Sequence, residues 1–561
     1  MSNQSAPAQH ADDVSTATSR TGGEAAVATL ERAGIDHLFG VQGGAIMPVY
    51  DALYDSTMDH VTMAHERSAV HAAEAYGAIS GSPGVCLATS GPGSTNLVTG
   101  LADAEANAAP VLALTGQAPS HLIGGDAFQE AATVGVTQPV TKANALVTDV
   151  DAVGDTVAEA LALARAGRPG PTLVDLPKDV TLATTDRSPA TPSSPTETDA
   201  PKRVDPASVR AAAEALAHAE RPVVLSGGGV IAAGASDELR AFATAHDFPV
   251  ATTPPGVGSF PEDHPLALSV AGTDGTASAN LTLANADFFL AVGTGVADHR
   301  SGGKSLAPDA EVVHLGVDAT ATSGGVPDDS LVGDIGTLLG RLFDAMPRSP
   351  DLAAWRAQSA AWRREYAPDD TPADGSLQPR PVVERLDELT PDDTLVTTGG
   401  GRHRLWAMRY WTFRHPRTWL SSNGLGTMGY GLPAAIGACV ATGGDRSVVC
   451  FEGDDSFLTT QQELAVAVRE ELDLTVVVLN DADPESSRRS GDTPSADHRT
   501  APTRAGIPQF DVLADVFGAR GFRLDDPDDV ERTLGAALAV DGPSVVDVHL
   551  DPTVGSGSTP R

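Results

Sequence analysis

The sequence predicts an α/β protein of three doubly wound domains, each built around a parallel sheet. Helical patterns alternate with short apolar strands along most of the 561 residues, which is the pattern typical of this fold class. The chain is too long to bury a single hydrophobic core, so about three domains are expected. A segment rich in Pro, Ser and Thr at residues 186–202 interrupts the alternation and predicts a linker between domains.

The first predicted domain covers residues 21–185 and follows a tail at residues 1–20 that we expect to be disordered. Its helical patterns and apolar strands are Glu24–Ala33, His37–Val41, Ala69–Gly77, Val85–Thr89 and Val111–Thr115. Its glycine-rich loops are Gly43–Gly44, Ser90–Ser94 and Gly124–Gly125. Such loops let the backbone approach a ligand closely, but they also serve as ordinary tight turns.

The second predicted domain covers residues 203–346 and repeats the same alternation. Its apolar runs are Pro222–Gly229, Phe288–Gly293 and Val312–Asp318. A strand that ends in glycines is typical of dinucleotide-binding folds, but no GxGxxG pattern follows, so nucleotide binding stays open here. A charged connector that contains tryptophan, residues 347–380, leads to a third domain at residues 381–551. Residues 552–561 are expected to form a frayed tail.

The composition excludes several classes of partner and location. The chain has 74 acidic and 37 basic residues, a net charge of −37, which disfavours binding to nucleic acid or to an anionic membrane. No apolar run is long enough for a transmembrane helix, and the N-terminus does not have the pattern of a signal peptide. Three scattered cysteines predict no disulfide framework, so we expect a cytoplasmic protein. The acidic surface indicates adaptation to concentrated salt.

The segment from Phe451 to Asp483 carries the clearest chemistry. An apolar strand, a helical pattern and a β-branched strand form a predicted βαβ unit, with Asp454 in a turn after the first strand and Asp481 and Asp483 after the second. A right-handed crossover brings both loops to the same edge of a parallel sheet, where carboxylates suit Mg²⁺. The alternative is that these residues only end strands and cap helices.

Motifs along most of the chain resemble those of the thiamine-diphosphate (ThDP) enzymes, in particular the acetolactate synthase (acetohydroxyacid synthase) large-subunit family. GDD at Gly453–Asp455, then a spacer and ND at Asn480–Asp481, is similar to the family's diphosphate-binding GDG…NN pattern. The other matching stretches are HERSAVHAAEAYG (His65–Gly77), TSGPGSTNLVTGLADA (Thr89–Ala104), LTGQAP (Leu114–Pro119), GGDAFQE (Gly124–Glu130), DLPKDV (Asp175–Val180) and SNGLGTMGYGLPAAIGA (Ser422–Ala438).

The resemblance implies a pyrimidine-binding, a central and a diphosphate-binding domain, with ThDP and Mg²⁺ as cofactors and FAD as a further cofactor that it allows. It assigns Glu66 to the pyrimidine ring of ThDP, Met428 to the wedge beneath the cofactor, and Asp454, Asp481 and Asp483 to the metal. Phe128 and Gln129 fall at catalytic positions at the active-site entrance, with Lys178 and Arg300 beside substrate or flavin. The remaining implied cofactor contacts are Gly43, Gly44, Ser90, Gly91, Pro92, Gly93, Gly426, Gly453, Asp455 and Ser456.

The implied reaction is decarboxylation of pyruvate and ligation of the two-carbon unit to a second 2-oxo acid, in branched-chain amino acid biosynthesis. In the family the two halves of the cofactor site come from different subunits, which implies a homodimer or homotetramer, and a small regulatory subunit accompanies some members.

Several residues depart from the family pattern, so two alternatives stay open. Asp455 replaces a glycine and Asp481 an asparagine near the diphosphate, and the family's substrate-binding arginine position is Gly295, with Arg300 as a nearby substitute. Added negative charge beside the diphosphate is expected to weaken cofactor binding unless Mg²⁺ or salt compensates. The alternatives are a ThDP enzyme for a different 2-oxo acid or acceptor, and a homologue with impaired catalysis.

Overall fold

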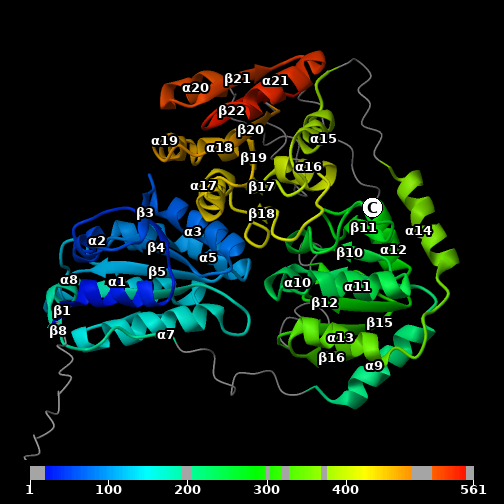
Figure 1. Ribbon diagram of the computed structural model, residues 1–561, viewed down its shortest axis with the longest axis horizontal. Coiled ribbons are helices and arrows are strands. Elements are labelled where there is room, and N and C mark those ends of the chain that lie inside the picture. The colour runs from blue at the N-terminus through cyan, green and yellow to red at the C-terminus, as the bar shows by residue number, and fades with distance from the viewer. Residues whose placement is uncertain are drawn as a thin grey trace, which may run out of the picture.

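The computed structural model describes residues 19–192, 204–298, 304–318, 327–367, 376–481 and 508–550. Within them lie three six-stranded parallel sheets with helices on their faces, which confirms the predicted fold class (Figure 1). The central strands of each sheet are buried on both faces and read as apolar runs, which is typical of parallel sheets, whereas the edge strands β3, β6, β16 and β21 are partly exposed.

The first domain has the strand order β3-β2-β4-β5-β7-β6, with every neighbouring pair parallel. The strands are β2 (His37–Gly40), β3 (Asp59–Thr62), β4 (Gly84–Ala88), β5 (Val111–Gln117), β6 (Ala143–Leu146) and β7 (Thr172–Pro177). The helices are α1 (Gly22–Arg32), α2 (Met47–Tyr54), α3 (Glu66–Ser80), α4 (Pro92–Asn96), α5 (Val98–Ala106), α6 (Thr133–Thr137), α7 (Val153–Arg165) and α8 (Lys178–Leu182). A two-stranded antiparallel pair, β1 (Arg20–Thr21) with β8 (Thr184–Thr185), brings the two ends of this domain together.

The second domain has the order β11-β10-β9-β12-β15-β16. Its strands are β9 (Pro222–Ser226), β10 (Val250–Thr252), β11 (Ala267–Val270), β12 (Phe288–Val292), β15 (Glu311–Gly316) and β16 (Asp329–Val332), with a small pair β13 (Ala297–Asp298) and β14 (Lys304–Ser305). Its helices are α9 (Pro206–His218), α10 (Gly228–Ala232), α11 (Ser236–His246), α12 (Ala277–Ala284) and α13 (Ile335–Ala345). The expected connector contains a further helix, α14 (Ala353–Glu365), which packs on this domain through buried Trp355, whose indole donates to Pro222 O at 3.0 Å.

The third domain has the order β18-β17-β19-β20-β22-β21. Its strands are β17 (Leu395–Thr398), β18 (Trp419–Ser421), β19 (Val448–Gly453), β20 (Thr475–Asn480), β21 (Arg520–Leu524) and β22 (Ser544–His549). Its helices are α15 (Pro379–Leu389), α16 (Arg402–Tyr410), α17 (Gly431–Thr442), α18 (Asp454–Leu458), α19 (Leu464–Arg469), α20 (Phe510–Phe517) and α21 (Val530–Leu538). The two predicted strands of the βαβ unit are confirmed as β19 and β20. The predicted turn after β19 is wrong, because Asp454 begins the short helix α18.

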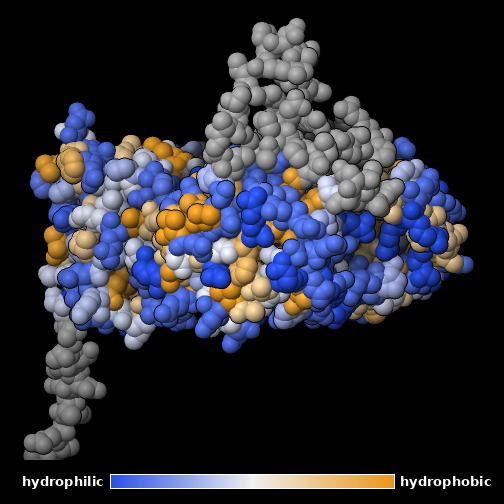
Figure 2. Space-filling view, turned by 90° about the horizontal axis from the view of Figure 1, so that it is seen from above, coloured by the Kyte–Doolittle hydropathy of each residue, from blue (hydrophilic) through white to orange (hydrophobic). Residues whose placement is uncertain are grey.

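Other expectations from the sequence are met in the described part of the chain. Cys86, Cys439 and Cys450 are buried and free. None of the described helices is long and apolar enough to cross a membrane. Figure 2 shows a largely hydrophilic face with small hydrophobic patches, in keeping with the acidic composition.

Helix α3 of the first domain packs against α17 of the third, and the two helices share one hydrophobic core (Figure 1). The approach is close because Gly437 has no side chain: a Cβ at this position would lie 2.1 Å from Ala72 O. The contact is therefore backbone against backbone, and it fixes the position of the first domain relative to the third.

We expect Gly437→Ala to lower the free energy of unfolding by about 1–3 kcal/mol, because the added methyl group forces α3 and α17 apart. Gly340→Ala is the matched control, since Gly340 also lies inside a helix but has open space around its Cβ position. This control is expected to be neutral or stabilising by about 0.5–1 kcal/mol. Urea denaturation of both variants measures the difference, and equal effects would contradict the close packing at Gly437.

Candidate active site

Three loops converge at the carboxyl edge of the third sheet, where β17, β18 and β19 end. Gly400 N donates to Thr427 O at 2.9 Å, and Gly429 N donates to Ser456 Oγ at 2.8 Å. A Cβ at Gly399 would lie 2.6 Å from Ser456 Oγ, so this glycine is required for the close approach. The loops form a cradle of backbone around the start of α18, and such glycine-rich cradles suit an anionic group.

The structure places two of the three predicted metal ligands on neighbouring strands of this edge. Asp454 follows β19 and Asp481 follows β20, and both residues are buried. The two strands pair in parallel, with Gly453 opposite Leu479. Asp454 Oδ1 accepts a hydrogen bond from Asp455 N at 2.7 Å, while the neighbouring Asp455 is exposed. The third predicted ligand, Asp483, lies outside the described residues.

Arg402, the first residue of α16, forms an ion pair with Asp481, with Nη1 2.9 Å from Oδ2. The guanidinium also lies over the ring of Trp406, 5.0 Å from its centroid. Arg402 was not among the predicted site residues. The pair changes the electrostatics expected from the sequence, because the added negative charge of Asp481 is balanced by a cation from the neighbouring loop.

A second pair beneath the cradle was also missed from the sequence. His403 Nε2 lies 3.6 Å from Glu452 Oε2, and both side chains are buried. Burial, followed by the charge of Arg404, lowers the pKa of His403 to about 3, so the ring is neutral. Burial also raises the pKa of Glu452 to about 7. The ring of His403 packs against Gly453, the residue before α18, since a Cβ on Gly453 would lie 2.8 Å from His403 Nδ1.

The predicted pyrimidine loops converge at the carboxyl edge of the first sheet, around Thr89. A Cβ on Gly43 would lie 2.4 Å from Thr89 Cβ, and one on Gly93 would lie 2.8 Å from Thr89 Cγ2 and 3.4 Å from Glu66 Oε1. Thr89 Oγ1 accepts from Ala45 N at 3.2 Å. Thr89 therefore contacts each of these loops. It was not a predicted site residue, although it begins the matching stretch Thr89–Ala104.

Glu66 begins α3, where the helix dipole favours a carboxylate. Its side chain is 13% exposed, and Oε2 accepts from Asn96 Nδ2 at 2.9 Å. The neighbouring backbone is held by the third domain of the same chain: Ala64 N donates to Glu463 Oε2 at 3.0 Å, and Arg67 Nη2 donates to Thr459 O at 3.0 Å. Contacts with the residues just beyond α18 therefore fix the start of α3.

The other predicted residues differ in their surroundings. Gln129 has a left-handed backbone, with φ of 56°, and its carbonyl packs against Gly91, where a Cβ would lie 2.8 Å away. Phe128 and Met428 expose large apolar side chains, 89% and 42% respectively. The rest of the predicted set is placed as follows: Ser90 is buried before α4, Pro92 begins α4, Lys178 begins α8 and is half-buried, Gly44 faces open space, and Gly426 has φ of 76°. Arg300 lies outside the described residues.

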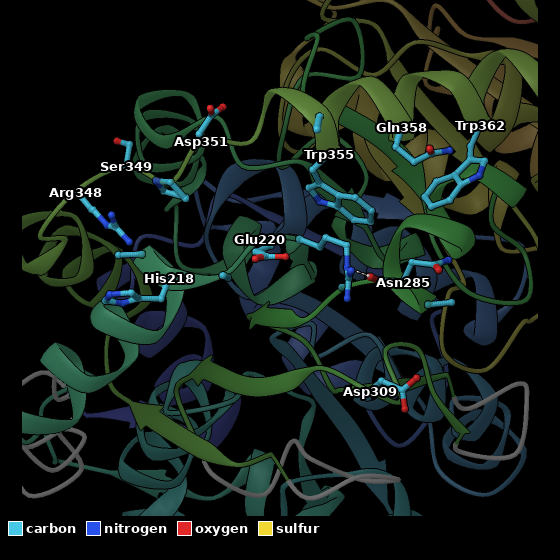
Figure 3. Close-up of a pocket in the computed structure, with 17 residues that line it drawn as sticks. His218, Glu220, Asn285, Asp309, Arg348, Ser349, Asp351, Trp355, Gln358 and Trp362 are labelled. Carbon is cyan, nitrogen blue, oxygen red and sulfur yellow. Dashed lines mark hydrogen bonds between the residues drawn. The ribbon is translucent and has the colours of Figure 1, made fainter.

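The central domain has glycines at the carboxyl ends of β9 and β12, and packing accounts for them. A Cβ on Gly227 would lie 2.4 Å from Thr294 Cβ, and one on Gly229 would lie 2.8 Å from Gly293 Cα. An open cavity of about 1100 Å³ lies at the opposite, amino edge of the same sheet, lined by Arg221 and Trp355 among others (Figure 3). The two edges are separate, so this cavity is not part of the converging loops described above.

Comparisons with known proteins agree with this arrangement. Residues 20–136, 209–342 and 399–548 match, in order, the N-terminal TPP binding domain, the central domain and the C-terminal TPP binding domain of thiamine pyrophosphate enzymes. The acetolactate synthase large subunit of Parasynechococcus marenigrum is 39% identical over 94% of this chain and 87% of that protein. The isozyme 2 large subunit of Escherichia coli is 38% identical over 94% and 95%, and the mitochondrial catalytic subunit of Saccharomyces cerevisiae is 36% identical over 95% and 81%.

Glu463 generates a prediction about pH. Burial raises its pKa to about 7, although Ala64 N and Arg67 oppose the shift. The folded protein keeps this proton to higher pH than the unfolded chain, so the free energy of unfolding falls as the pH rises from about 4.5 to about 7. Glu463→Gln removes this loss and still accepts from Ala64 N. We therefore expect the variant to match the original protein near pH 4 and to exceed its stability by about 2–3 kcal/mol above pH 7.

Thermal and urea denaturation of the two proteins across this pH range test the expectation. Glu214→Gln, on the exposed face of α9, is the control and is expected to show no such pH-dependent gain. A constant difference between Glu463→Gln and the original protein at all pH values would contradict a raised pKa.

Proposed function

The chain belongs to the thiamine pyrophosphate enzymes, among the acetolactate synthase large subunits, and we propose that it decarboxylates pyruvate and joins the two-carbon unit to a second 2-oxo acid. The proposal places the reaction in branched-chain amino acid biosynthesis. The observation that carries it is that one chain contains both halves of such a site: Glu66 at the carboxyl edge of the first sheet, and the Asp454 and Asp481 cradle at the carboxyl edge of the third.

The residues fit the cofactor that this reaction requires. Thiamine diphosphate, the same compound as thiamine pyrophosphate, has an anionic diphosphate, and the third domain offers the backbone cradle at Gly399–Gly400, with Arg402 beside it. Asp454 and Asp481 supply the hard oxygen ligands that suit Mg²⁺ bound to phosphates. Glu66 supplies a shielded carboxylate for the pyrimidine ring. When bound, the thiazolium ring stabilises the negative charge left on the substrate after CO₂ departs.

The protein's own side chains position and shield the reaction. Glu66 would hydrogen-bond the pyrimidine ring of the cofactor, and Asn96 Nδ2 donates to its Oε2, which fixes the orientation of the carboxylate. Met428 presents an exposed apolar surface against which the cofactor can bend. Phe128, Gln129 and Lys178 are assigned to the entrance, where Lys178 provides a positive charge for the substrate carboxylate.

We propose a homodimer at least, because the two domains that hold one cofactor belong to different subunits in the family. The strongly exposed Phe128 and the exposed Leu425 and Met428 support this proposal, since large apolar side chains around a site favour burial by a second copy.

A small regulatory subunit is proposed from the name "large subunit" of the relatives. FAD stays a further cofactor that the family resemblance allows, while the glycines of the central domain are explained by loop packing. We propose that the acidic surface keeps the protein soluble in a cell interior rich in salt. The expected location of the protein is the cytoplasm.

Two alternatives, a different 2-oxo acid or acceptor and impaired catalysis, can be distinguished from the proposed reaction by experiment. A different 2-oxo acid is favoured by Gly295, which lacks the side chain of the family's substrate-binding arginine. Impaired catalysis is suggested by the replacements Asp455 and Asp481. The Arg402 pair and the exposure of Asp455 weaken that second alternative, because the extra charges are balanced or face solvent.

Glu66→Gln is expected to lower the rate of CO₂ release from pyruvate by about 100-fold or more, because it removes the carboxylate assigned to the cofactor ring. The measurement is CO₂ and acetolactate formation with ThDP and Mg²⁺, at KCl concentrations from dilute to molar. Glu238→Gln, an exposed carboxylate in the first turn of α11, is the control. Turnover of other oxo acids without pyruvate would select the first alternative. Absence of ThDP binding to the original protein would overturn both the proposed reaction and the alternative with a different 2-oxo acid.

Arg402→Gln is expected to weaken Mg²⁺-dependent ThDP binding by about 10-fold or more, or about 1.4 kcal/mol, because the charge of Asp481 then acts on the diphosphate without this balance. The double variant Arg402→Gln with Asp481→Asn removes both charges and is expected to recover most of the affinity. Calorimetric titration of the original protein, both single variants and the double variant gives the coupling. Additive effects of the two substitutions would contradict a coupled pair.

A further inference from the structure

A compact group of buried ionisable side chains lies away from the Asp454 cradle, where α3 and α5 face the start of α17. His71 and Glu74 are three residues apart on α3, so they project from one face of the helix. Asp103 faces them from α5. All three residues are at most 3% exposed. One nitrogen of His71 and one oxygen of each carboxylate lie within 4.8 Å of one another.

Two of the six polar side-chain atoms in this group, one oxygen of each carboxylate, have donors that fix their orientation. Glu74 Oε1 accepts from Asn107 Nδ2 at 2.8 Å and from the Tyr430 hydroxyl at 3.4 Å. Asp103 Oδ1 accepts from Ser422 Oγ at 2.8 Å. Tyr430 and Ser422 belong to the third domain, so the third domain helps to hold carboxylates of the first.

The other four have no hydrogen-bond partner among the described residues. These atoms are Glu74 Oε2, Asp103 Oδ2 and both ring nitrogens of His71. Asp103 Oδ2 lies 3.8 Å from His71 Nδ1, too far for a hydrogen bond. Buried polar atoms without partners are costly, and a fully buried imidazole with two unused nitrogens is unusual. A bound species between the three residues would satisfy the free oxygen of each carboxylate and one ring nitrogen of His71.

The chemistry of the group favours a metal ion as that species. Burial lowers the pKa of His71 to about 3, so its ring is neutral and offers a nitrogen lone pair. Burial raises the pKa of Glu74 and raises the pKa of Asp103 to about 6, so a bound divalent cation would take the place of a proton and hold both carboxylates ionised. One imidazole and two carboxylates are ligands that Zn²⁺ accepts at about 2.0–2.2 Å, whereas Mg²⁺ prefers oxygen ligands and retains water. Donors on the second oxygen of each carboxylate are the outer contacts that metal sites use to orient their ligands.

We propose that His71, Glu74 and Asp103 of the first domain bind one Zn²⁺ ion beside the contact with the third domain. The site shares no residue with the Asp454 and Asp481 cradle and does not depend on the proposed reaction. The His71 Nδ1 to Asp103 Oδ2 separation is wider by a few tenths of an ångström than tetrahedral coordination at about 2.1 Å requires. Small side-chain rotations close this gap. The fourth ligand is a group from outside the chain, such as water.

The test measures zinc in the full-length protein. The protein is unfolded in urea with a chelator, refolded with excess Zn²⁺ so that access to the buried site is not limiting, washed with a weak chelator, and analysed for metal. We expect about one zinc per chain and a higher thermal midpoint than for protein refolded without metal. Co²⁺ in place of Zn²⁺ is expected to give the intense visible absorption of a tetrahedral site.

Glu74→Gln and Asp103→Asn keep the shape of each side chain and are expected to lower zinc affinity by about 100-fold or more. Asp175→Asn is the matched control: Asp175 is also a buried carboxylate of the first domain, but Thr115 and Gln117 occupy its two oxygens at 2.7 and 2.8 Å. Asp454→Asn, at the cradle, is likewise expected to retain zinc. Circular dichroism checks that each variant folds.

Two results would overturn the proposal. The first is original protein that folds fully and retains no zinc or cobalt, which would mean that protons alone occupy the group. The second is zinc retained equally by Glu74→Gln and Asp103→Asn, which would place the ion elsewhere. The metal content of the original protein decides between the first result and the proposal even if a variant fails to fold.

Discussion

The close packing of α3 on α17 is the contact on which the rest of the structure depends. The two helices approach within backbone distance at Gly437, and each leads to a functional segment. Glu66 begins α3, while Met428 lies two residues before Tyr430, which precedes α17. A shift between these helices would therefore move a carboxylate of the first domain relative to an apolar surface of the third. The buried group around His71 lies along the same contact, so its occupancy bears directly on how firmly the helices are joined.

The fold could be read from the sequence because parallel strands buried on both faces appear as short apolar runs between helical patterns. The segments predicted as strands correspond to β2, β4, β5, β9, β12, β15, β19 and β20. Short features were harder, since local pattern does not separate a turn from the five-residue helix α18. Candidate site residues could be named from the sequence where a single local motif identifies them, as GDD identifies Asp454. They were missed where two distant segments meet: Arg402 and Asp481 are 79 residues apart, and Ala64 and Glu463 are 399 apart.

The departures from the family pattern have different physical meanings once their surroundings are known. Asp481 is buried, but a guanidinium from the neighbouring loop balances its charge. Asp455 faces solvent in the first turn of α18, where the helix dipole stabilises a carboxylate. Neither replacement leaves a buried charge beside the cradle without compensation. Gly295 differs from both, because a side chain is lost there and no charge is added.

The Arg402–Asp481 pair also bears on the history of the chain. If an ancestor had neutral residues at both positions, acquiring aspartate first would have placed an anion against an anionic cofactor, with no arginine at position 402 to offset it. An ancestor that acquired arginine first would have gained attraction for the same cofactor. Inheritance of the pair is therefore easier in one order, arginine and then aspartate. Among descendants, the aspartate should occur rarely without the arginine, whereas the arginine can persist alone.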